Sequence, residues 1–176
     1  YTTADKEVKD GLVNAGDVRV GDSLFERDKV TFPQIPSFAP EHFSIARVKD
    51  TGRYKQFRKG IAQLDEEGVV QVLRSPETGD QAPVLAAVGP MQFEVASHRM
   101  ATEFNTPIAL ESLPYTIARA VHPEDAAFVD KQVSMEVLTR TDGVMLALFT
   151  TKRRLQGFQE DNPKVRLSSL VAAGEN

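Results

Sequence analysis

The stretch that most constrains the fold is residues 64–116, because helices and strands follow one another there without interruption. A predicted helix ends at Glu67, and the apolar run Val69–Leu73 follows at once as a predicted strand. A polar turn leads to a second apolar run, Val84–Val88, which is also typical of a strand. Pro90 then opens a helix, since the first N–H group of a helix needs no partner. The stretch therefore predicts helix, strand, strand and helix in that order.

The neighbouring residues extend this order to a complete unit. After Pro90, side chains recur at the spacing of one helix face. They are Phe93, Ala96, Ser97, Met100 and Phe104. Residues 108–111 are predicted to form a strand, as are residues 43–48. An amphipathic helix follows the strand at 43–48, and its inner face holds Tyr54, Phe57, Ile61 and Leu64. The order β-α-β-β-α-β is the ferredoxin-like plan, in which two helices cover one face of a four-stranded sheet. We expect its core to include Phe57, Leu64, Val72, Leu85, Phe93, Met100 and Phe104.

The same order of elements is predicted again in the last third of the chain. The expected elements lie at residues 115–121, 124–131, 134–139, 144–149, 152–160 and 165–170. The two halves share no sequence identity, so the repeat is one of element order only. The predicted fold class is α+β. We expect the end of a β-barrel domain, followed by a C-terminal α/β domain of two ferredoxin-like βαββαβ units in tandem, 43–113 and 114–176.

The beginning of the chain is predicted to belong to a different domain. Residues 1–31 are expected to be the trailing strands of a β-barrel, domain II, because short apolar runs alternate there with Gly-Asp turns. Residues 32–42 are predicted to be a Pro-rich linker, since closely spaced prolines hold the backbone extended. A polyproline recognition segment is the alternative. Residues 43–176 would then form the C-terminal domain, domain III.

The composition restricts the possible function classes. With 41% hydrophobic residues, a chain of 176 residues can bury a sizeable core. No run approaches the roughly 18–20 apolar residues of a membrane span, and no signal peptide is expected from the charged start. The lack of cysteine excludes disulfides and thiolate metal sites and fits a reducing compartment. A net charge of -4 argues against nucleic-acid binding over the whole surface, although local basic patches can still contact phosphate.

No group of residues in the sequence predicts chemistry of its own. The histidines, His42, His98 and His122, are far apart and lack the spacing of metal ligands. Acidic residues gather at 65–67, where a helix ends, and at 124–125, where a helix begins. Acids complement the helix dipole at a helix start, whereas those at 65–67 lie at its unfavourable end. We therefore predict no catalytic, cofactor-binding or metal site.

Four separated segments carry a family resemblance. They are LDEEGVVQV at 64–72, AAVGPMQFEV at 86–95, residues 99–104 and the Pro-rich segment 35–43. Taken in their order along the chain, they resemble the bacterial peptide chain release factor 3 family. The resemblance covers residues 11–170, is weakest in the last third, and is more specific than a single glycine motif. The strand–glycine–helix passage also resembles, more faintly, the third domain of elongation factor G.

This resemblance implies a translational GTPase of three domains that acts on the ribosome, where its GTP-bound form promotes departure of the class 1 release factor. The chain has no G-x-x-x-x-G-K-[ST] for the phosphates of GTP and no Asn-Lys-x-Asp for guanine. It is therefore interpreted as a C-terminal fragment that lacks the GTPase domain. Such a fragment is not an enzyme and holds no cofactor, while its parent protein binds GTP and GDP. We expect a cytoplasmic monomer whose partner is the ribosome and which contacts no membrane. The alternatives are the corresponding region of another translational GTPase, such as elongation factor G, and a free-standing ferredoxin-like ligand-binding module.

Two basic groups are the candidate contacts with the ribosome. The first lies on the helix after residue 53 and the second opens the last helix. The six residues are Lys55, Arg58, Lys59, Lys152, Arg153 and Arg154. A solvated helix face is the alternative for the first group. Positive charge at a helix start works against the helix dipole, so the second group favours a partner, either ribosomal RNA or an acidic ribosomal protein.

Overall fold

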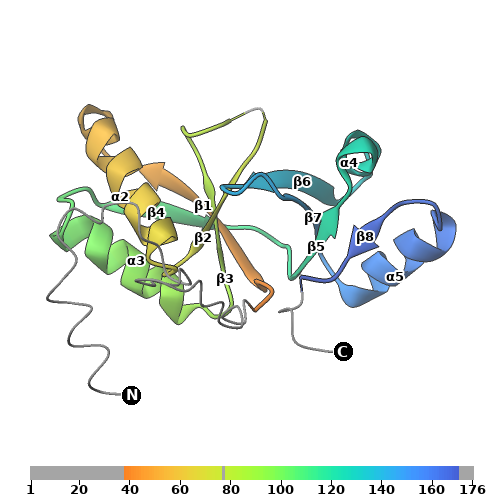
Figure 1. Cartoon of the computed structure of the whole chain (residues 1–176). Coiled ribbons are helices and arrows are strands. Elements are labelled where there is room, and N and C mark those ends of the chain that lie inside the picture. The colour runs from red at the N-terminus through yellow and green to blue at the C-terminus, as the bar shows by residue number, and fades with distance from the viewer. Residues whose placement is uncertain (1–37, 77, 171–176) are drawn as a thin grey trace, which may run out of the picture. The chain divides into compact units, whose positions relative to one another are not determined.

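The first half of the described chain contains two α-helices and four strands. The computed structural model describes residues 38–76 and 78–170 (Figure 1). The elements of the first half are β1 (His42–Val48), the short 3-10 helix η1 (Thr51–Arg53), α2 (Tyr54–Glu66), β2 (Gln71–Arg74), β3 (Val84–Ala87), α3 (Met91–Thr102) and β4 (Ile108–Ser112). Asp50 starts the first helical segment, because its carboxylate accepts a hydrogen bond from the backbone N–H of Gly52 at 2.9 Å.

The second half has the same order of elements as the first. Its elements are β5 (Ile117–Val121), α4 (Pro123–Asp130), β6 (Met135–Arg140), β7 (Met145–Phe149), α5 (Lys152–Asp161) and β8 (Leu167–Ser168). Pro123 opens α4. The hydroxyl of Thr151 caps α5 by accepting a hydrogen bond from the backbone N–H of Arg154 at 3.1 Å. The predicted last strand, 165–170, is reduced to the two residues of β8.

Helices and an antiparallel sheet occur together in one chain, which confirms the predicted α+β class. The trailing barrel strands predicted at residues 1–31 lie outside the described residues, as does most of the linker predicted at 32–42. The domain boundaries 43–113 and 114–176 also stay predictions.

The described strands form one sheet in the order β4-β1-β3-β2-β6-β7-β5-β8. Each half contributes four neighbouring strands, and the second half repeats the strand order of the first in reverse. The two halves are joined where β2 pairs with β6 in antiparallel fashion, through Leu73 opposite Arg140 and Arg74 opposite Thr139. The second strand of each half is therefore the junction of the molecule's two halves.

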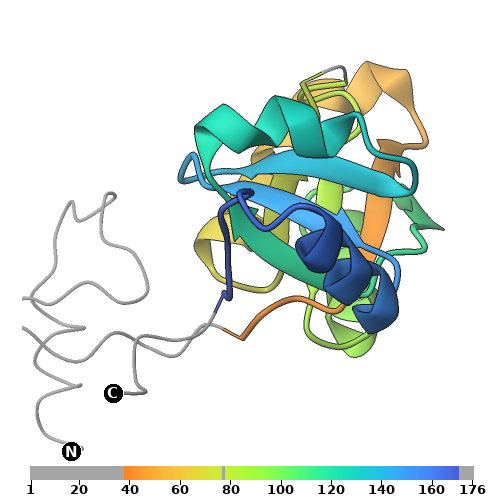
Figure 2. The same cartoon turned by 90° about the vertical axis from the view of Figure 1, so that its right-hand side faces the viewer.

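Each half buries one face of its strands under its own two helices. Beneath α2 and α3 the core includes Ala46, Leu64, Val72, Leu85 and Met100. Beneath α4 and α5 it includes Val129, Val137, Phe149, Leu155 and Phe158. Figure 1 shows α2 and α3 on one side of the strands and α4 and α5 on the other. In Figure 2 the hairpin of β6 and β7 runs between α4 and α5.

The opposite faces of the two half-sheets also meet in a shared core. Successive strand residues point to opposite faces, and those that point away from the helices are buried as well. This central core holds Phe43, Leu73, Val84, Ala86, Ala118, Leu138, Leu146 and Leu148, each at most 3% exposed. Because both faces of β3 and β7 are covered, these strands read as nearly continuous apolar runs, VLAA and MLALF.

The two helices of the first half approach closely at Gly60. A Cβ atom at this position would lie 2.5 Å from Sδ of Met100 and 2.9 Å from Cγ of Phe104, so only glycine fits without a shift of these side chains. Met100 lies at the centre of the contact and is fully buried. Phe93 and Phe104, which were both expected in the core, are only partly buried. Phe93 lies in the first turn of α3 and Phe104 just beyond the end of the helix, and both keep part of their surface exposed.

An aspartate at the end of the first helix of each half makes the same hydrogen bond. Asp65 Oδ1 accepts from the backbone N–H of Val72 at 2.9 Å, and Asp130 Oδ1 accepts from that of Val137 at 2.8 Å. Both bonds span seven residues and fasten the helix end to the following strand. This explains why an acid stands at the unfavourable end of the dipole of α2. Asp65 Oδ2 also accepts from Thr141 Oγ1 at 2.6 Å, which ties the first half to the second.

Truncation of a side chain in the central core should destabilise the whole fold. We expect Leu138→Ala to lower the free energy of unfolding by about 2–5 kcal/mol, because the missing apolar side chain leaves a cavity between the two half-sheets. The control is Val133→Ala, since Val133 is 77% exposed and its truncation should change stability by no more than about 0.5 kcal/mol. Urea unfolding measures both, and a loss below about 1 kcal/mol for Leu138→Ala would place the central core in doubt.

Candidate functional site

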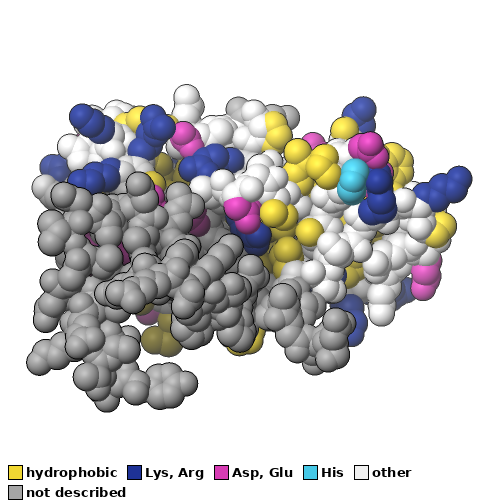
Figure 3. Space-filling model, in the orientation of Figure 1, with side chains coloured by type: hydrophobic (Ala, Val, Ile, Leu, Met, Phe, Trp, Pro, Cys, Tyr) yellow, Lys and Arg dark blue, Asp and Glu magenta, His cyan; other side chains and the backbone are white. Residues whose placement is uncertain are grey.

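The first predicted basic group lines a hollow in the first half. Lys55, Arg58 and Lys59 lie on the exposed side of α2. The hollow has a volume of about 380 Å³ and is bounded by α2, the end of β2 and the loop between β2 and β3. Figure 3 shows Lys and Arg side chains gathered over the region of α2. We call this feature the α2 hollow.

Asp80 orients the two arginines of the α2 hollow. Its carboxylate accepts a hydrogen bond from Nε of Arg74 at 2.5 Å and lies 3.2 Å from Nη2 of Arg58. The hydrogen bond from Arg74 lowers the pKa of Asp80 below its ordinary value, and the charges of both arginines add to this effect. Sequence reasoning missed Arg74 and Asp80. The signal that could have found them is an arginine at the end of a strand with an acid in the loop that follows.

The second predicted basic group lies in the other half and lines a different hollow. Arg153 and Arg154 border a space of about 680 Å³ between the start of α5 and the turn after α4. Nη2 of Arg154 donates a hydrogen bond to the backbone carbonyl of Val133 at 2.8 Å. At the corresponding place in the first half, Nε2 of Gln92 donates to the carbonyl of Val69 at 2.9 Å. Arg154 therefore has a structural role, which explains one of the cations at this helix start without a partner.

The two hollows differ in the charge of the residues that line them. Lys55, Lys59, Lys152 and Arg153 form no ion pair with any residue that the structure describes. The acid that lines the second hollow is Asp161. The α2 hollow thus carries the larger excess of positive charge, because it adds Arg74 to three predicted cations.

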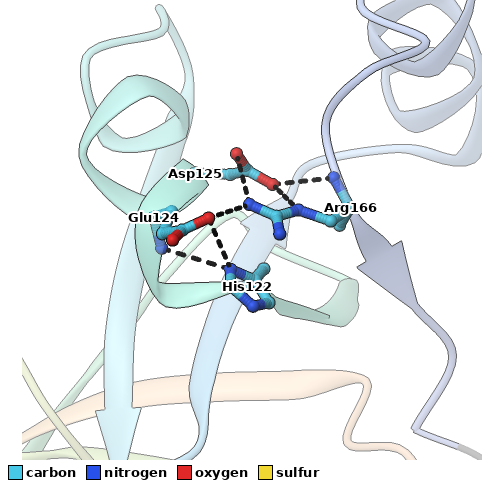
Figure 4. A network of polar contacts seen from close by, with 4 residues as sticks. All are labelled: His122, Glu124, Asp125 and Arg166. Atoms are coloured by element: carbon cyan, nitrogen blue, oxygen red, sulfur yellow. Dashed lines mark hydrogen bonds and ion pairs between the residues drawn. The ribbon is translucent and has the colours of Figure 1, made fainter.

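The acids at the start of α4 fasten the end of the described chain, as Figure 4 shows. Asp125 Oδ2 accepts hydrogen bonds from the backbone N–H of Arg166 at 3.0 Å and from its Nε at 2.9 Å. Glu124 Oε2 accepts from Nη2 of Arg166 at 2.7 Å. Nδ1 of His122 accepts from the backbone N–H of Glu124 at 3.4 Å and so caps the helix. These four residues connect the segment just before β8 to the start of α4.

Glu67 and the two other histidines stand apart from this network. Glu67 pairs with Arg99, and hydrogen bonds from Arg99 and then Gln63 lower the pKa of Glu67. His42 and His98 are exposed on separate elements. Among residues 38–76 and 78–170, no three acids or histidines cluster in a way that could hold a metal ion. In the same part of the chain, no helix is both long and apolar enough to cross a membrane.

Comparison with known proteins assigns the chain to a family. The family described as class II release factor RF3, C-terminal domain, matches residues 32–159. The chain belongs to this family. Peptide chain release factor 3 of Microcystis aeruginosa is 37% identical over 166 residues, which are 93% of this chain and 30% of that protein. The protein of the same name from Symbiobacterium thermophilum is 38% identical over 156 residues, 87% of this chain and 29% of the relative.

The family membership confirms the predicted resemblance to the release factor 3 family. The chain spans about three tenths of the length of the curated relatives that it matches. The match includes the described strands except β8, α2 with its hollow, and most of α5. It ends before Arg166, so the network in Figure 4 lies partly outside the matched residues.

In this member of the release factor 3 family, the Asp125–Arg166 pair should make stability depend on pH. Hydrogen bonds from Arg166 lower the pKa of Asp125 to about 2, whereas an unfolded chain has an aspartate pKa of about 3.9. A lowered folded-state pKa adds stability above the unfolded pKa, and this stability is lost as the pH falls through the folded pKa. We therefore expect the stability difference between the wild type and Asp125→Asn to be full at pH 7 and to shrink below about pH 4.

Urea unfolding at several pH values between 7 and 3 measures this difference. In an Arg166→Gln background the same Asp125→Asn change should show a much weaker pH dependence, because the guanidinium group that lowers the pKa is gone. A difference that stays constant across the whole range in the wild-type background would contradict the assigned ion pair.

Proposed function

We propose that this chain is the non-catalytic C-terminal region of a translational GTPase of the release factor 3 type, which acts on the ribosome in translation termination. In this role the parent protein promotes dissociation of class 1 release factors. The observation that carries the proposal is the family match over residues 32–159, since it spans both halves of the described fold rather than one short motif.

We also infer that each half is a ferredoxin-like unit and that the two units act as one body. The inference is supported by the element order β-α-β-β-α-β in each half and by the strand order 4-1-3-2 within each half of the sheet. The central core packs the two half-sheets together, and closely packed interiors transmit displacement rather than absorb it. A single rigid arm of this kind suits a region that positions a GTPase on the ribosome.

In this proposal the chain contributes contacts, and the parent protein contributes the nucleotide chemistry. The sequence has neither the phosphate-binding loop nor the guanine-recognition motif of a GTPase, so GTP and GDP would be bound by another domain. The partners are ribosomal RNA and ribosomal proteins, with class 1 release factors affected indirectly. We place the parent protein in the cytoplasm, as a monomer without membrane contact. The proposed contacts are Lys55, Arg58 and Lys59 with ribosomal RNA, and Lys152 and Arg153 with an acidic ribosomal protein.

Arg154 is the one predicted contact that the proposal leaves out. Its guanidinium group is already bonded to the carbonyl of Val133. A charge reversal at Arg154 would therefore disturb the turn after α4, and weaker ribosome binding by such a variant could not be assigned to the ribosome surface alone. Variants of the α5 group should change Lys152 and Arg153 only.

A chimera tests the proposed function. The C-terminal region of peptide chain release factor 3 from Microcystis aeruginosa would be replaced by this chain over the residues that match. We expect the chimera to retain GTP-dependent dissociation of a class 1 release factor from post-termination ribosomes, because the replaced region supplies only placement. The release of a fluorescently labelled class 1 factor measures this activity.

Two controls accompany the chimera. The relative without its C-terminal region should bind GTP but fail to release the class 1 factor. The isolated chain should show no GTP binding by calorimetry. A chimera that folds and binds GTP normally, yet releases the class 1 factor no faster than the truncated relative, would refute the proposed function.

A further inference from the structure

We propose that the α2 hollow binds phosphate groups of an RNA backbone, with Lys55 and Lys59 as its direct contacts. The inference rests on the proposed function, because ribosomal RNA is the RNA that this region would meet. It is narrower than that function, since it selects one surface and one chemical class of partner.

The α2 hollow carries a clear excess of positive charge. Among the residues that the structure describes, four cations line it, namely Lys55, Arg58, Lys59 and Arg74, against the single acid Asp80. The three cations of α2 stand at positions i, i+3 and i+4, where like charges destabilise a helix. The first turn of α2 contains no acid that could offset them. An anionic partner would relieve this repulsion.

The cations of the hollow divide into two oriented arginines and two unpaired lysines. Asp80 holds the guanidinium groups of Arg58 and Arg74 in place, at 3.2 Å and 2.5 Å. The ammonium groups of Lys55 and Lys59 have no ion-pair partner in the described part of the chain. The hollow therefore presents two unpaired charges beside two arginines that are already oriented.

An aromatic ring in the hollow favours RNA over an acidic protein segment. Tyr54 lines the same hollow and lies against Phe57, with ring centroids 6.1 Å apart and planes inclined by 27°. An aromatic ring beside cations is the combination on which single-stranded nucleic acids stack their bases while their phosphates are neutralised. A volume of about 380 Å³ also lies in the usual range of small-ligand sites and can admit a nucleotide.

The helix that carries the lysines is held rigidly. Away from the lysines, Gly60 of α2 lies so close to the side chains of Met100 and Phe104 that a Cβ at this position would clash with them. Asp65 fastens the end of the helix to Val72. The lysines therefore stand on a fixed helix, so a smaller entropy cost opposes the binding of a partner.

The α5 group is the weaker candidate for the same role. Arg154 is bonded to a backbone carbonyl, and Asp161 lines the same hollow as Arg153. Within the described part of the chain, Lys152 and Arg153 remain as the free cations of this group. This difference supplies a matched control, because both surfaces offer two free cations for the same charge reversal.

The test compares Lys55→Glu/Lys59→Glu with Lys152→Glu/Arg153→Glu, both in the whole chain. Fluorescence anisotropy of a labelled single-stranded oligouridylate gives the association constant at several salt concentrations. Removing one cation that neutralises a phosphate of a single strand reduces the slope of log K against log salt by about 0.7, so the α2 variant should lose about 1.4 in slope and bind at least about tenfold more weakly at low salt. The α5 variant should bind almost as the wild type does.

Further variants and measurements decide the remaining cases. The variant Lys55→Gln/Lys59→Gln removes the two charges without reversing them. It should show a similar loss of slope with a smaller loss of affinity. It replaces the Glu variant in the test if the charge reversal disturbs folding. An unchanged slope in both α2 variants would overturn the inference. If the α2 variants lose ribosome binding but keep oligouridylate binding, the surface meets an acidic protein and the inference is also wrong. Loss of RNA binding as expected, together with an inactive chimera, would support this site while refuting the proposed function.

Discussion

The packing of the two half-sheets against each other is the interaction on which the rest of the structure depends. A sheet with helices on one face leaves its other face uncovered; in this chain that face is apolar, and each half covers that of the other. Leu73 and Leu138, at equivalent places in the two junction strands, are both fully buried in this central core. Only two residue pairs join β2 to β6. The apolar packing, rather than the strand pairing, therefore supplies most of the cohesion between the halves.

Polar contacts at the junction set the position of the α2 hollow. Thr141, from the turn between β6 and β7, donates to Asp65 at the end of α2, and Nη1 of Arg74 donates to Thr141 Oγ1 at 3.2 Å. Arg74 also binds Asp80 and stands in the strand pair that joins the halves. The surface proposed to bind RNA thus lies beside the strand pair that connects the two halves. A partner held there would fix both halves together.

Sequence patterns predicted the order of the elements because helix and strand spacings are local properties. They did not reveal the central core, since nothing local shows which distant strand covers a given face. The uniformly apolar runs VLAA and MLALF were the available signal, because they are typical of strands covered on both faces. A second signal of the repeat was an aspartate seven residues before a valine in each half, Asp65 before Val72 and Asp130 before Val137. The two basic groups were found by sequence alone, whereas the internal bond of Arg154 depends on a carbonyl that only the fold brings near.

The central claim is that the two halves form one cooperative body, and native-state hydrogen exchange tests it most directly. Amides of β3 in the first half and of β7 in the second lie on either side of the central core and report on each half separately. The claim predicts that the slowest amides of both strands exchange with the same free energy and the same dependence on denaturant, because both require global unfolding. A lower free energy and a smaller denaturant dependence for one strand would show that its half opens alone, and would contradict the claim.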